Sequence, residues 1–233
     1  GPKGVREYKS KEPYPSTRMG TVALLRNTLY DVKRWMENPQ VNDKTKEFQY
    51  HYISKVLNKE MIAKIHLSTS PDEIIAVLEL IKEFDLHATI DHVFAGDLLI
   101  EQIKQANVPV VYGPVMLSKL YSAFRYVNDQ IPVKLCKAGV LVALMTDHPV
   151  IAQKHLRLLG SVVVRNGLSY DEALKMITVN PAKMLKVDDK VGSICPGKDG
   201  DIVVSSDHPL KLDSQIEIVI VDGEIVFCRS NYI

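Results

Sequence analysis

The sequence predicts an α/β protein built from four successive units of one strand and one helix. Short apolar runs of strand length alternate with amphipathic stretches of about ten to fifteen residues. Capping and turn residues separate these segments, and ionisable side chains follow several of the apolar runs. Such alternation is typical of βαβ units and a parallel sheet. Four units fit either half of a (β/α)8 barrel or a small, open, doubly wound sheet.

The first part of the chain precedes this alternating pattern. Residues 1–20 are polar and basic and contain several prolines, so we expect an irregular segment. From Thr21 to about Met36, apolar residues recur every three or four positions, which predicts an amphipathic helix. Asn38-Pro39 ends this helix, and a second helix is predicted over about residues 43–58.

Each of the four units starts with a predicted strand. The helix after the first strand opens with the capping box Ser70–Glu73 and has proline at its first position. The helix before the fourth strand closes on Gly139, which suits a left-handed cap. The predicted strands are residues 61–66, 87–92, 109–113 and 139–147.

After the fourth strand the pattern changes. Helices are predicted at about residues 150–166 and from the capping box at Ser169 to about Thr178, and Asn180-Pro181 then caps a short helix. The remaining residues alternate like antiparallel strands, and Asp222-Gly223 is typical of a hairpin turn. The C-terminal residues are therefore expected to form a small β element distinct from the parallel sheet.

The composition argues against several functional classes. The 233 residues include 29 basic and 28 acidic side chains, and a net charge of +1 disfavours a nucleic-acid or membrane-surface partner. The apolar runs are too short to cross a bilayer, and no secretion signal is recognisable. The three cysteines form no CxxC pair, so we expect a reduced, cytoplasmic protein without a disulfide or thiolate metal site.

Three ionisable side chains fall at the ends of predicted strands. His66 ends the first strand, His92 the second and Asp147 the fourth. The carboxyl ends of parallel strands meet at one face in barrels and open sheets alike, so these side chains are expected to converge. Two neutral imidazoles and a carboxylate suit a divalent transition ion such as Zn²⁺, with one position left for water. The carboxylate then serves as general base and later as general acid.

Structural roles compete with this interpretation. A single histidine at a strand end is more often structural, and Asp147, two residues before Pro149, also suits a helix N-cap. Asp91 is interpreted as a turn residue or as a residue that orients a neighbouring ligand. The spacing alone leaves a metal site and a set of structural residues about equally supported.

Two further residues are candidates for substrate binding. Arg18 is predicted to contact an anionic substrate, with a solvated basic segment as the simpler interpretation. His148 is predicted to line the mouth of the site, and a solvated loop position is equally plausible. The remaining histidines are interpreted as structural or exposed; they are His51, His87, His155 and His208.

Longer motifs resemble a known family. Residues 180–204, NPAKMLKVDDKVGSICPGKDGDIVV, resemble the C-terminal signature of the amidohydrolase superfamily. IHLSTSPDEI, TIDHVFAGD, VPVVYGP and LMTDHPV resemble the last four barrel strands of the imidazolonepropionase-related metal-dependent hydrolases, and PSTRMGTVALLR is similar to a further segment of that group. The resemblance covers nearly the whole chain. It implies the second half of a TIM-like (β/α)8 barrel, strands 5–8, with a small C-terminal β element.

The resemblance also implies residue roles. His66 matches the histidine ligand of the fifth strand, His92 that of the sixth, and Asp147 the aspartate of the eighth strand that binds metal and transfers protons. The implied reaction is hydrolysis of C–N bonds in amides, cyclic amides or imines of a small-molecule substrate by metal-activated water. Zn²⁺ is the expected ion, with Fe or Mn as alternatives.

The chain also departs from the family pattern. The first-strand His-x-His pair and the bridging residue of the fourth strand have no counterpart, so we expect this chain to be a fragment, or a short protein that forms a homo-oligomer or pairs with a missing N-terminal half. The alternative is a non-catalytic α/β scaffold. The expected divisions are residues 1–60 with an irregular segment and helices, 61–187 with the half-barrel and following helices, and 188–233 with strands of a composite β-sandwich.

Overall fold

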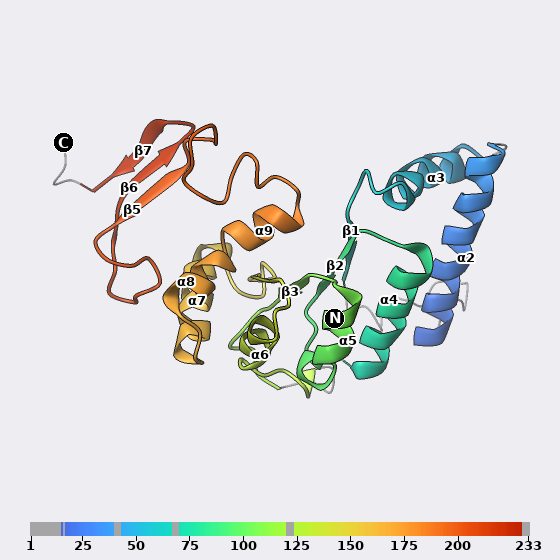
Figure 1. Cartoon of the computed structure of the whole chain (residues 1–233), viewed down its shortest axis with the longest axis horizontal. Coiled ribbons are helices and arrows are strands. Elements are labelled where there is room, and N and C mark those ends of the chain that lie inside the picture. Colours follow the sequence, from blue (N-terminus) through green and yellow to red (C-terminus); the bar gives the residue numbers. More distant parts are fainter. Residues whose placement is uncertain (1–14, 16, 40–42, 67–69, 120–123, 230–233) are drawn as a thin grey trace. The chain divides into compact units, whose positions relative to one another are not determined.

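The structure, a computed structural model, describes residues 15, 17–39, 43–66, 70–119 and 124–229. These residues form two compact units (Figure 1). The first contains the described residues up to Ala63 together with residues 75–87. The second contains residues 64–74 and the described residues from Ala88 onward.

The first unit is helical. Helices α2 (Arg18–Glu37) and α3 (Lys44–Leu57) confirm the two predicted N-terminal helices, and α2 ends just before Asn38, as predicted. Helix α2 begins at Arg18, so residues 18–20 are helical and not irregular as expected. Thr17 caps α2 by accepting a hydrogen bond from the Gly20 backbone, and Asp43 caps α3 in the same way. The unit's apolar cluster joins α2, α3 and α4 (Pro71–Phe84); its residues are Leu29, Ile53, Leu57, Leu80, Phe84 and Leu86.

The second unit is built on a four-stranded sheet in the order β1-β2-β3-β4, which agrees with a sheet made from successive βα units. The strands are β1 (Ala63–Ile65), β2 (Ala88–Asp91), β3 (Val110–Tyr112) and β4 (Val142–Leu144). The pairs β2–β3 and β3–β4 are parallel. Every residue of β2 and β4 is buried, as expected where both faces of a parallel sheet are covered.

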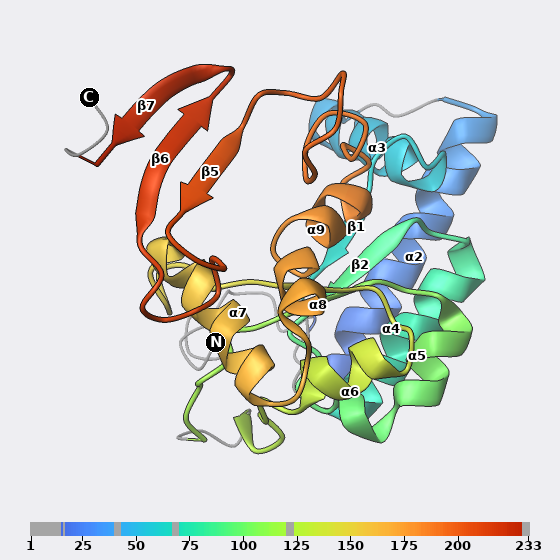
Figure 2. The same ribbon diagram turned by 60° about the vertical axis from the view of Figure 1, so that its left-hand side comes forward.

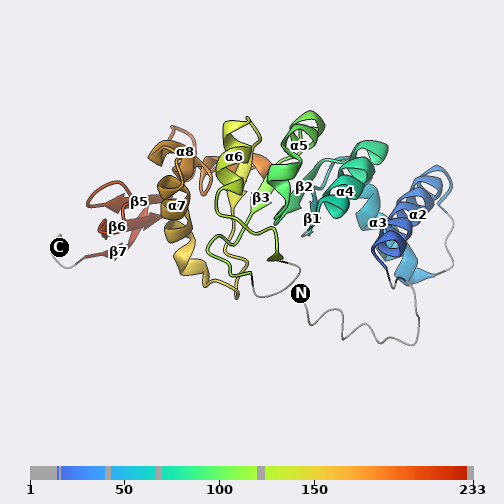
Figure 3. The same ribbon diagram turned by 90° about the horizontal axis from the view of Figure 1, so that it is seen from below.

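Short helices connect these strands. The turn η1 (Gly96–Leu98) and helix α5 (Ile100–Ala106) follow β2, and α6 (Ile131–Lys137) precedes β4. Figure 3 shows α5 and α6 on the same side of β2 and β3. Helix α6 ends at Lys137, and the predicted left-handed cap residue, Gly139, follows with a φ of +89°. The Gly139 and Val140 N–H groups donate to the Cys136 and Leu135 carbonyls, the pattern of a Schellman cap.

The segment after β4 differs from the prediction in two details. The predicted helix at 150–166 becomes η3 (Gln153–His155) followed by α7 (Leu156–Arg165). Helix α8 (Tyr170–Lys175) begins at the predicted Ser169 capping box. Asn180-Pro181 does not cap the next helix but lies inside α9 (Val179–Met184). The reason is tertiary: the Asn180 side-chain amide donates to the Val142 carbonyl of β4 at 2.8 Å.

The C-terminal residues form a separate antiparallel sheet, as predicted. Strands β5 (Ile202–Ser205), β6 (Ile216–Val221) and β7 (Glu224–Cys228) lie in the order β5-β6-β7 (Figure 2). The β6–β7 turn is Asp222-Gly223, with φ values of +53° and +81°, both in the region that a two-residue hairpin turn of type I′ requires.

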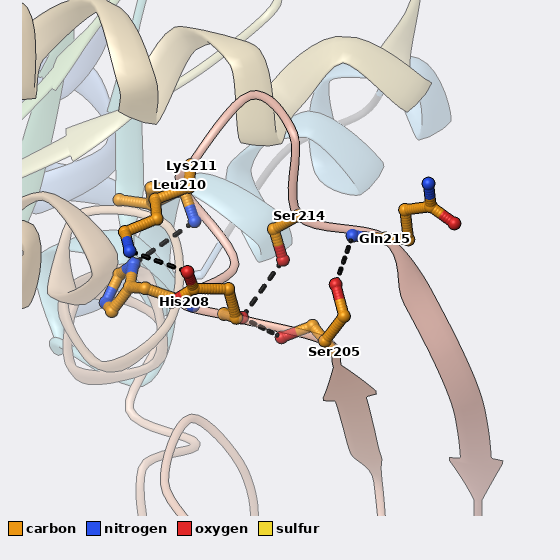
Figure 4. Close-up of polar contacts among 8 residues, drawn as sticks. Ser205, His208, Leu210, Lys211, Ser214 and Gln215 are labelled. Carbon is orange, nitrogen blue, oxygen red and sulfur yellow. Dashed lines mark hydrogen bonds and ion pairs between the residues drawn. The ribbon is translucent and has the colours of Figure 1, made fainter.

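The connection from β5 to β6 is held by polar contacts and one apolar anchor. The Ser205 and Ser214 hydroxyls both donate to the Asp207 carbonyl, and the Leu210 N–H donates to His208 Nδ1 (Figure 4). The Leu210 side chain is buried, and its carbonyl accepts a 2.6 Å hydrogen bond from the Ser161 hydroxyl of α7. This loop therefore attaches the small sheet to α7.

No helix in the described part of the chain is long and apolar enough to cross a membrane.

Candidate active site

The three predicted site residues follow strands of the second unit. His66 and His92 come directly after β1 and β2, and Asp147 lies three residues beyond the end of β4. His92 and Asp147 have φ values of +69° and +52°. The chain therefore turns sharply where these strands end, while the His92 N–H still donates to the Val111 carbonyl at 2.9 Å.

The two histidines meet. Their Nε2 atoms are 3.3 Å apart, and their rings lie edge to face with centroids separated by 4.6 Å. His92 is buried, whereas the side chain of His66 is 71% exposed. The convergence expected from the ends of neighbouring strands is thus present for this pair.

The other ring nitrogen of His92 is already engaged. Its Nδ1 lies 2.7 Å from the Gly113 carbonyl oxygen. Because a carbonyl oxygen only accepts, Nδ1 must carry the proton and donate. In the neutral ring this leaves a lone pair on Nε2, directed at His66, and a ring held in this way is typical of histidines that bind metal ions.

His92 and Asp147 line the same cavity. Its volume is about 270 Å³, and the remaining lining residues are Phe94, Pro114, Leu117, Ser118, Phe124 and Val150. The ring of Phe94 lies 5.2 Å from that of His92 and 5.8 Å from that of Phe124, centroid to centroid. A mostly apolar cavity with a few polar groups at one place has the character of a small-molecule site.

Burial sets the protonation of the central groups. Desolvation lowers the pKa of His92, against the opposing effects of its hydrogen bond to Gly113 and of the Asp147 and Asp91 carboxylates. His92 is therefore held as the neutral imidazole, the form that can bind a cation.

Asp91 is the residue whose importance the sequence did not establish. Its carboxylate is buried, with Oδ1 3.7 Å from Lys64 Nζ and Oδ2 3.9 Å from His66 Nδ1. Burial raises the pKa of Asp91, and the Lys64 ammonium and the two histidines oppose that rise. The feature of the sequence that could have indicated this role is that Asp91 directly precedes His92 at a strand end.

The remaining candidates lie elsewhere or stay untested. Arg18 is the exposed first residue of α2, in the first unit, and its role in substrate binding stays a prediction. His148 is exposed and does not line the cavity, so its role also stays a prediction. Among the histidines interpreted as structural, the ring of His51 packs on Tyr52 and that of His208 on Tyr170.

The signature segment contributes a structural lysine. Lys198 Nζ donates to the Ser193 hydroxyl at 2.7 Å and to the carbonyl oxygens of Asp188 and Val191. The Lys198 ammonium therefore holds together the loop between α9 and β5, and its hydrogen bonds are used for this structural role.

Within the residues described by the structure, no group of three or more His, Cys, Asp and Glu side chains is arranged to hold a metal ion. The histidine pair thus provides two donor atoms, with the Asp147 carboxylate on the wall of the same cavity.

Comparisons with known proteins give a consistent result. A profile of the amidohydrolase family matches residues 32–226. A 5-methylthioadenosine/S-adenosylhomocysteine deaminase from Thermoanaerobacter pseudethanolicus is 32% identical over 170 residues, which are 61% of this chain and 38% of that protein. An imidazolonepropionase from Picrophilus torridus is 28% identical, over 64% of this chain and 38% of that protein.

A solved structure agrees with these relatives. The crystal structure of an amidohydrolase from Thermotoga maritima superposes with a TM-score of 0.88 at 32% identity, covering 98% of this chain and 61% of that one. The chain therefore spans well under half the length of the two curated relatives and about three fifths of this structure. The resemblance found in the signature residues is confirmed, and the chain belongs to the amidohydrolase family.

Proposed function

We propose that this chain forms part of a metal-dependent hydrolase that cleaves C–N bonds with water. In this proposal, β1 to β4 are strands 5–8 of a (β/α)8 barrel. His66, His92 and Asp147 hold one divalent ion, with Zn²⁺ the first choice and Fe or Mn as alternatives. Asp147 also transfers the protons of the reaction.

The observation that carries the proposal is the distance between the two Nε2 atoms. A tetrahedral ion with Zn–N bonds of about 2.0–2.1 Å separates two ligand nitrogens by roughly 3.3–3.4 Å. The measured separation is 3.3 Å. Because His92 Nδ1 is protonated, its Nε2 presents a lone pair. The two Nε2 atoms therefore have the separation expected of two ligands of one ion.

Asp147 is the proposed third ligand. It lines the same cavity as His92, and its negative charge raises the pKa of His92 against the effect of burial. Its place beyond β4, two strands away from β2, matches the arrangement in which side chains from several strand ends share one site.

The proposed chemistry uses few residues. An ion bound there would lower the pKa of a coordinated water towards about 7. A carboxylate oxygen of Asp147 takes a proton from the attacking water and later gives it to the departing nitrogen, which must be protonated to leave. The hydrogen bond from Nδ1 to Gly113 keeps His92 from rotating, and the apolar wall formed by Phe94 and Phe124 excludes other water.

The proposed substrates are small molecules with a hydrolysable C–N bond. Relatives named adenine deaminase and 5-methylthioadenosine/S-adenosylhomocysteine deaminase support deamination of an amino-substituted ring as the first reaction to test. Imidazolonepropionase supports a cyclic amide as the second.

The proposal includes a partner. Four strands enclose only part of a barrel, and the relatives are longer than this chain. We therefore expect the 233-residue chain alone to be inactive or very weakly active, and to gain activity when the N-terminal part of the enzyme or a second copy completes the barrel. The proposed divisions remain residues 1–60, 61–187 and 188–233.

The test measures ion binding separately from activity. The metal-free 233-residue chain is titrated with Co²⁺ and Zn²⁺ by calorimetry and absorption spectroscopy. We expect one ion per chain, with the visible bands of tetrahedral Co²⁺, and loss of binding in His66→Gln and His92→Gln. His155→Gln is the matched control, because His155 is exposed in η3, outside the cavity.

Absence of ion binding in a folded wild-type chain would refute the metal site and favour the non-catalytic scaffold. Ion binding without release of ammonia from an amino-substituted ring, in the completed enzyme, would leave the site standing and refute deamination; failure to open cyclic amides as well would refute the proposed reaction.

A further inference from the structure

Two tautomers of His66 compete, and the ion site proposed above needs one of them. With the proton on Nε2, His66 donates toward His92 Nε2, and His66 Nε2 has no lone pair for an ion shared with His92. With the proton on Nδ1, the lone pair of Nε2 faces the His92 lone pair, and the two rings form a cation-binding pair. A residue that fixes the proton on Nδ1 would therefore prepare the site.

The buried carboxylate of Asp91 is in position to do so. Its Oδ2 is 3.9 Å from His66 Nδ1, and its Oδ1 is 3.7 Å from Lys64 Nζ. Lys64 and His66 are two residues apart and flank the same carboxylate, so the ammonium of Lys64 takes one oxygen and leaves the other for the imidazole. Asp91 Oδ1 is buried and has no hydrogen-bond partner among the described residues, and Lys64 and His66 lie at ion-pair distance from the carboxylate.

The charge of Asp91 favours the tautomer with the proton on Nδ1. The 3.3 Å contact between the two Nε2 atoms would be a hydrogen bond in the competing tautomer, so the two arrangements oppose each other. In that tautomer, the Nδ1 lone pair would also face a carboxylate. The 3.9 Å separation of His66 Nδ1 and Asp91 Oδ2 is an ion-pair distance, so the carboxylate acts on this ring through its charge.

We infer that Asp91 is a positioning residue. It holds the Nδ1–H tautomer of His66 and thereby directs the His66 Nε2 lone pair at the ion, while Lys64 orients the Asp91 carboxylate. This inference rests on the proposed function, because it assigns Asp91 a role in the same ion site. The arrangement is that of a carboxylate–histidine–metal triad. In such triads, loss of the orienting carboxylate typically weakens ion binding about 10- to 100-fold.

The experiment has two independent readouts. In the metal-free 233-residue chain, long-range ¹⁵N–¹H correlation spectra give the tautomer of His66. We expect Nδ1–H in the wild type and a shift toward Nε2–H in Asp91→Ala. Zn²⁺ titration should give an affinity about 10- to 100-fold weaker for Asp91→Ala. Asp91→Asn, whose amide oxygen still accepts a hydrogen bond, should fall between the two.

Two further variants separate orientation from a general loss of charge. Asp97→Ala removes a carboxylate that pairs with Lys134 at 3.0 Å in the same unit, without a histidine, and should leave Zn²⁺ affinity unchanged. Lys64→Met should weaken binding less than Asp91→Ala, and Lys64→Arg should restore it. Near-ultraviolet circular dichroism checks that each variant is folded, and the Asp91→Asn variant keeps the test valid if Asp91→Ala unfolds.

The outcomes are distinguishable. A wild type that binds Zn²⁺, together with folded Asp91 variants that keep both the wild-type affinity and the Nδ1–H tautomer, would overturn the role of Asp91 and leave the ion site intact. A wild type that binds no ion would refute the proposed function itself. The tautomer measurement then decides alone whether Asp91 controls the proton on His66.

Discussion

The strand-end glycine beside the histidine pair offers the sharpest test of how the fold supports the site. A Cβ atom on Gly113 would lie 2.0 Å from the Met145 carbonyl oxygen and 2.9 Å from Met145 Cγ. Ordinary C···O contacts are about 3.3 Å or longer, so the ends of β3 and β4 would have to separate by more than about 1 Å. The obstacle is a backbone atom, which cannot rotate aside.

The expected consequence of Gly113→Ala is twofold. Separating the two strands also strains the hydrogen bond between the Met145 N–H and the Tyr112 carbonyl, so we expect a loss of roughly 3 kcal/mol or more in the free energy of unfolding. For a chain of this size, that corresponds to a fall in Tm of roughly 6–12 °C. Because the Gly113 carbonyl accepts from His92 Nδ1, the variant should also weaken Zn²⁺ binding.

Gly139→Ala is the matched control. Gly139 also has a positive φ, +89°, but its Cβ would meet no atom within 4 Å. It should therefore show only the backbone penalty of about 1–2 kcal/mol and normal Zn²⁺ affinity. Urea unfolding followed by circular dichroism, together with Zn²⁺ calorimetry, measures both effects. Equal destabilisation of the two variants, or an unaltered Zn²⁺ affinity in Gly113→Ala, would refute the argument that this close approach positions His92.

Three further predictions concern the rest of the second unit. Leu210→Ala should lower the free energy of unfolding by about 2–5 kcal/mol in denaturant titrations, because it empties the apolar anchor on α7; a loss below 1 kcal/mol would contradict that anchoring role. Ser169→Ala should cost about 1 kcal/mol near neutral pH. The Ser169 hydrogen bonds lower the pKa of Glu172, so the part of the stability that comes from the Ser169 hydroxyl donating to this carboxylate is present above the unfolded-state pKa and is lost as the pH falls through the lower folded-state value; a penalty unchanged in acid would disprove the coupling. Burial raises the pKa of the Cys136 thiol, so iodoacetamide at pH 8 should label exposed Cys195 before Cys136 in peptide mass spectra, and the reverse order would contradict the structure.

The order of the elements was predictable because local chemistry specifies them. Apolar spacing predicted α2 and α3, Ser169 and Glu172 marked the start of α8, and Asp222-Gly223 marked the β6–β7 hairpin. The strands were less well bounded: the predicted run 139–147 contains only the three residues of β4. Apolar sequence shows where a strand is buried, whereas strand length depends on where its neighbours form hydrogen bonds.

The sequence by itself determined which residue types end each strand, and so identified His66 and His92 as a pair for one face of the sheet. Only the tertiary structure decided which groups contact them. The Gly113 carbonyl that fixes the proton of His92 comes from β3's end, 21 residues away, and the Lys64 ammonium beside Asp91 comes from a neighbouring strand. The sequence pattern left Asp91 as a turn residue or an orienting residue, because burial and charge pairing arise from contacts between segments that are distant in the chain.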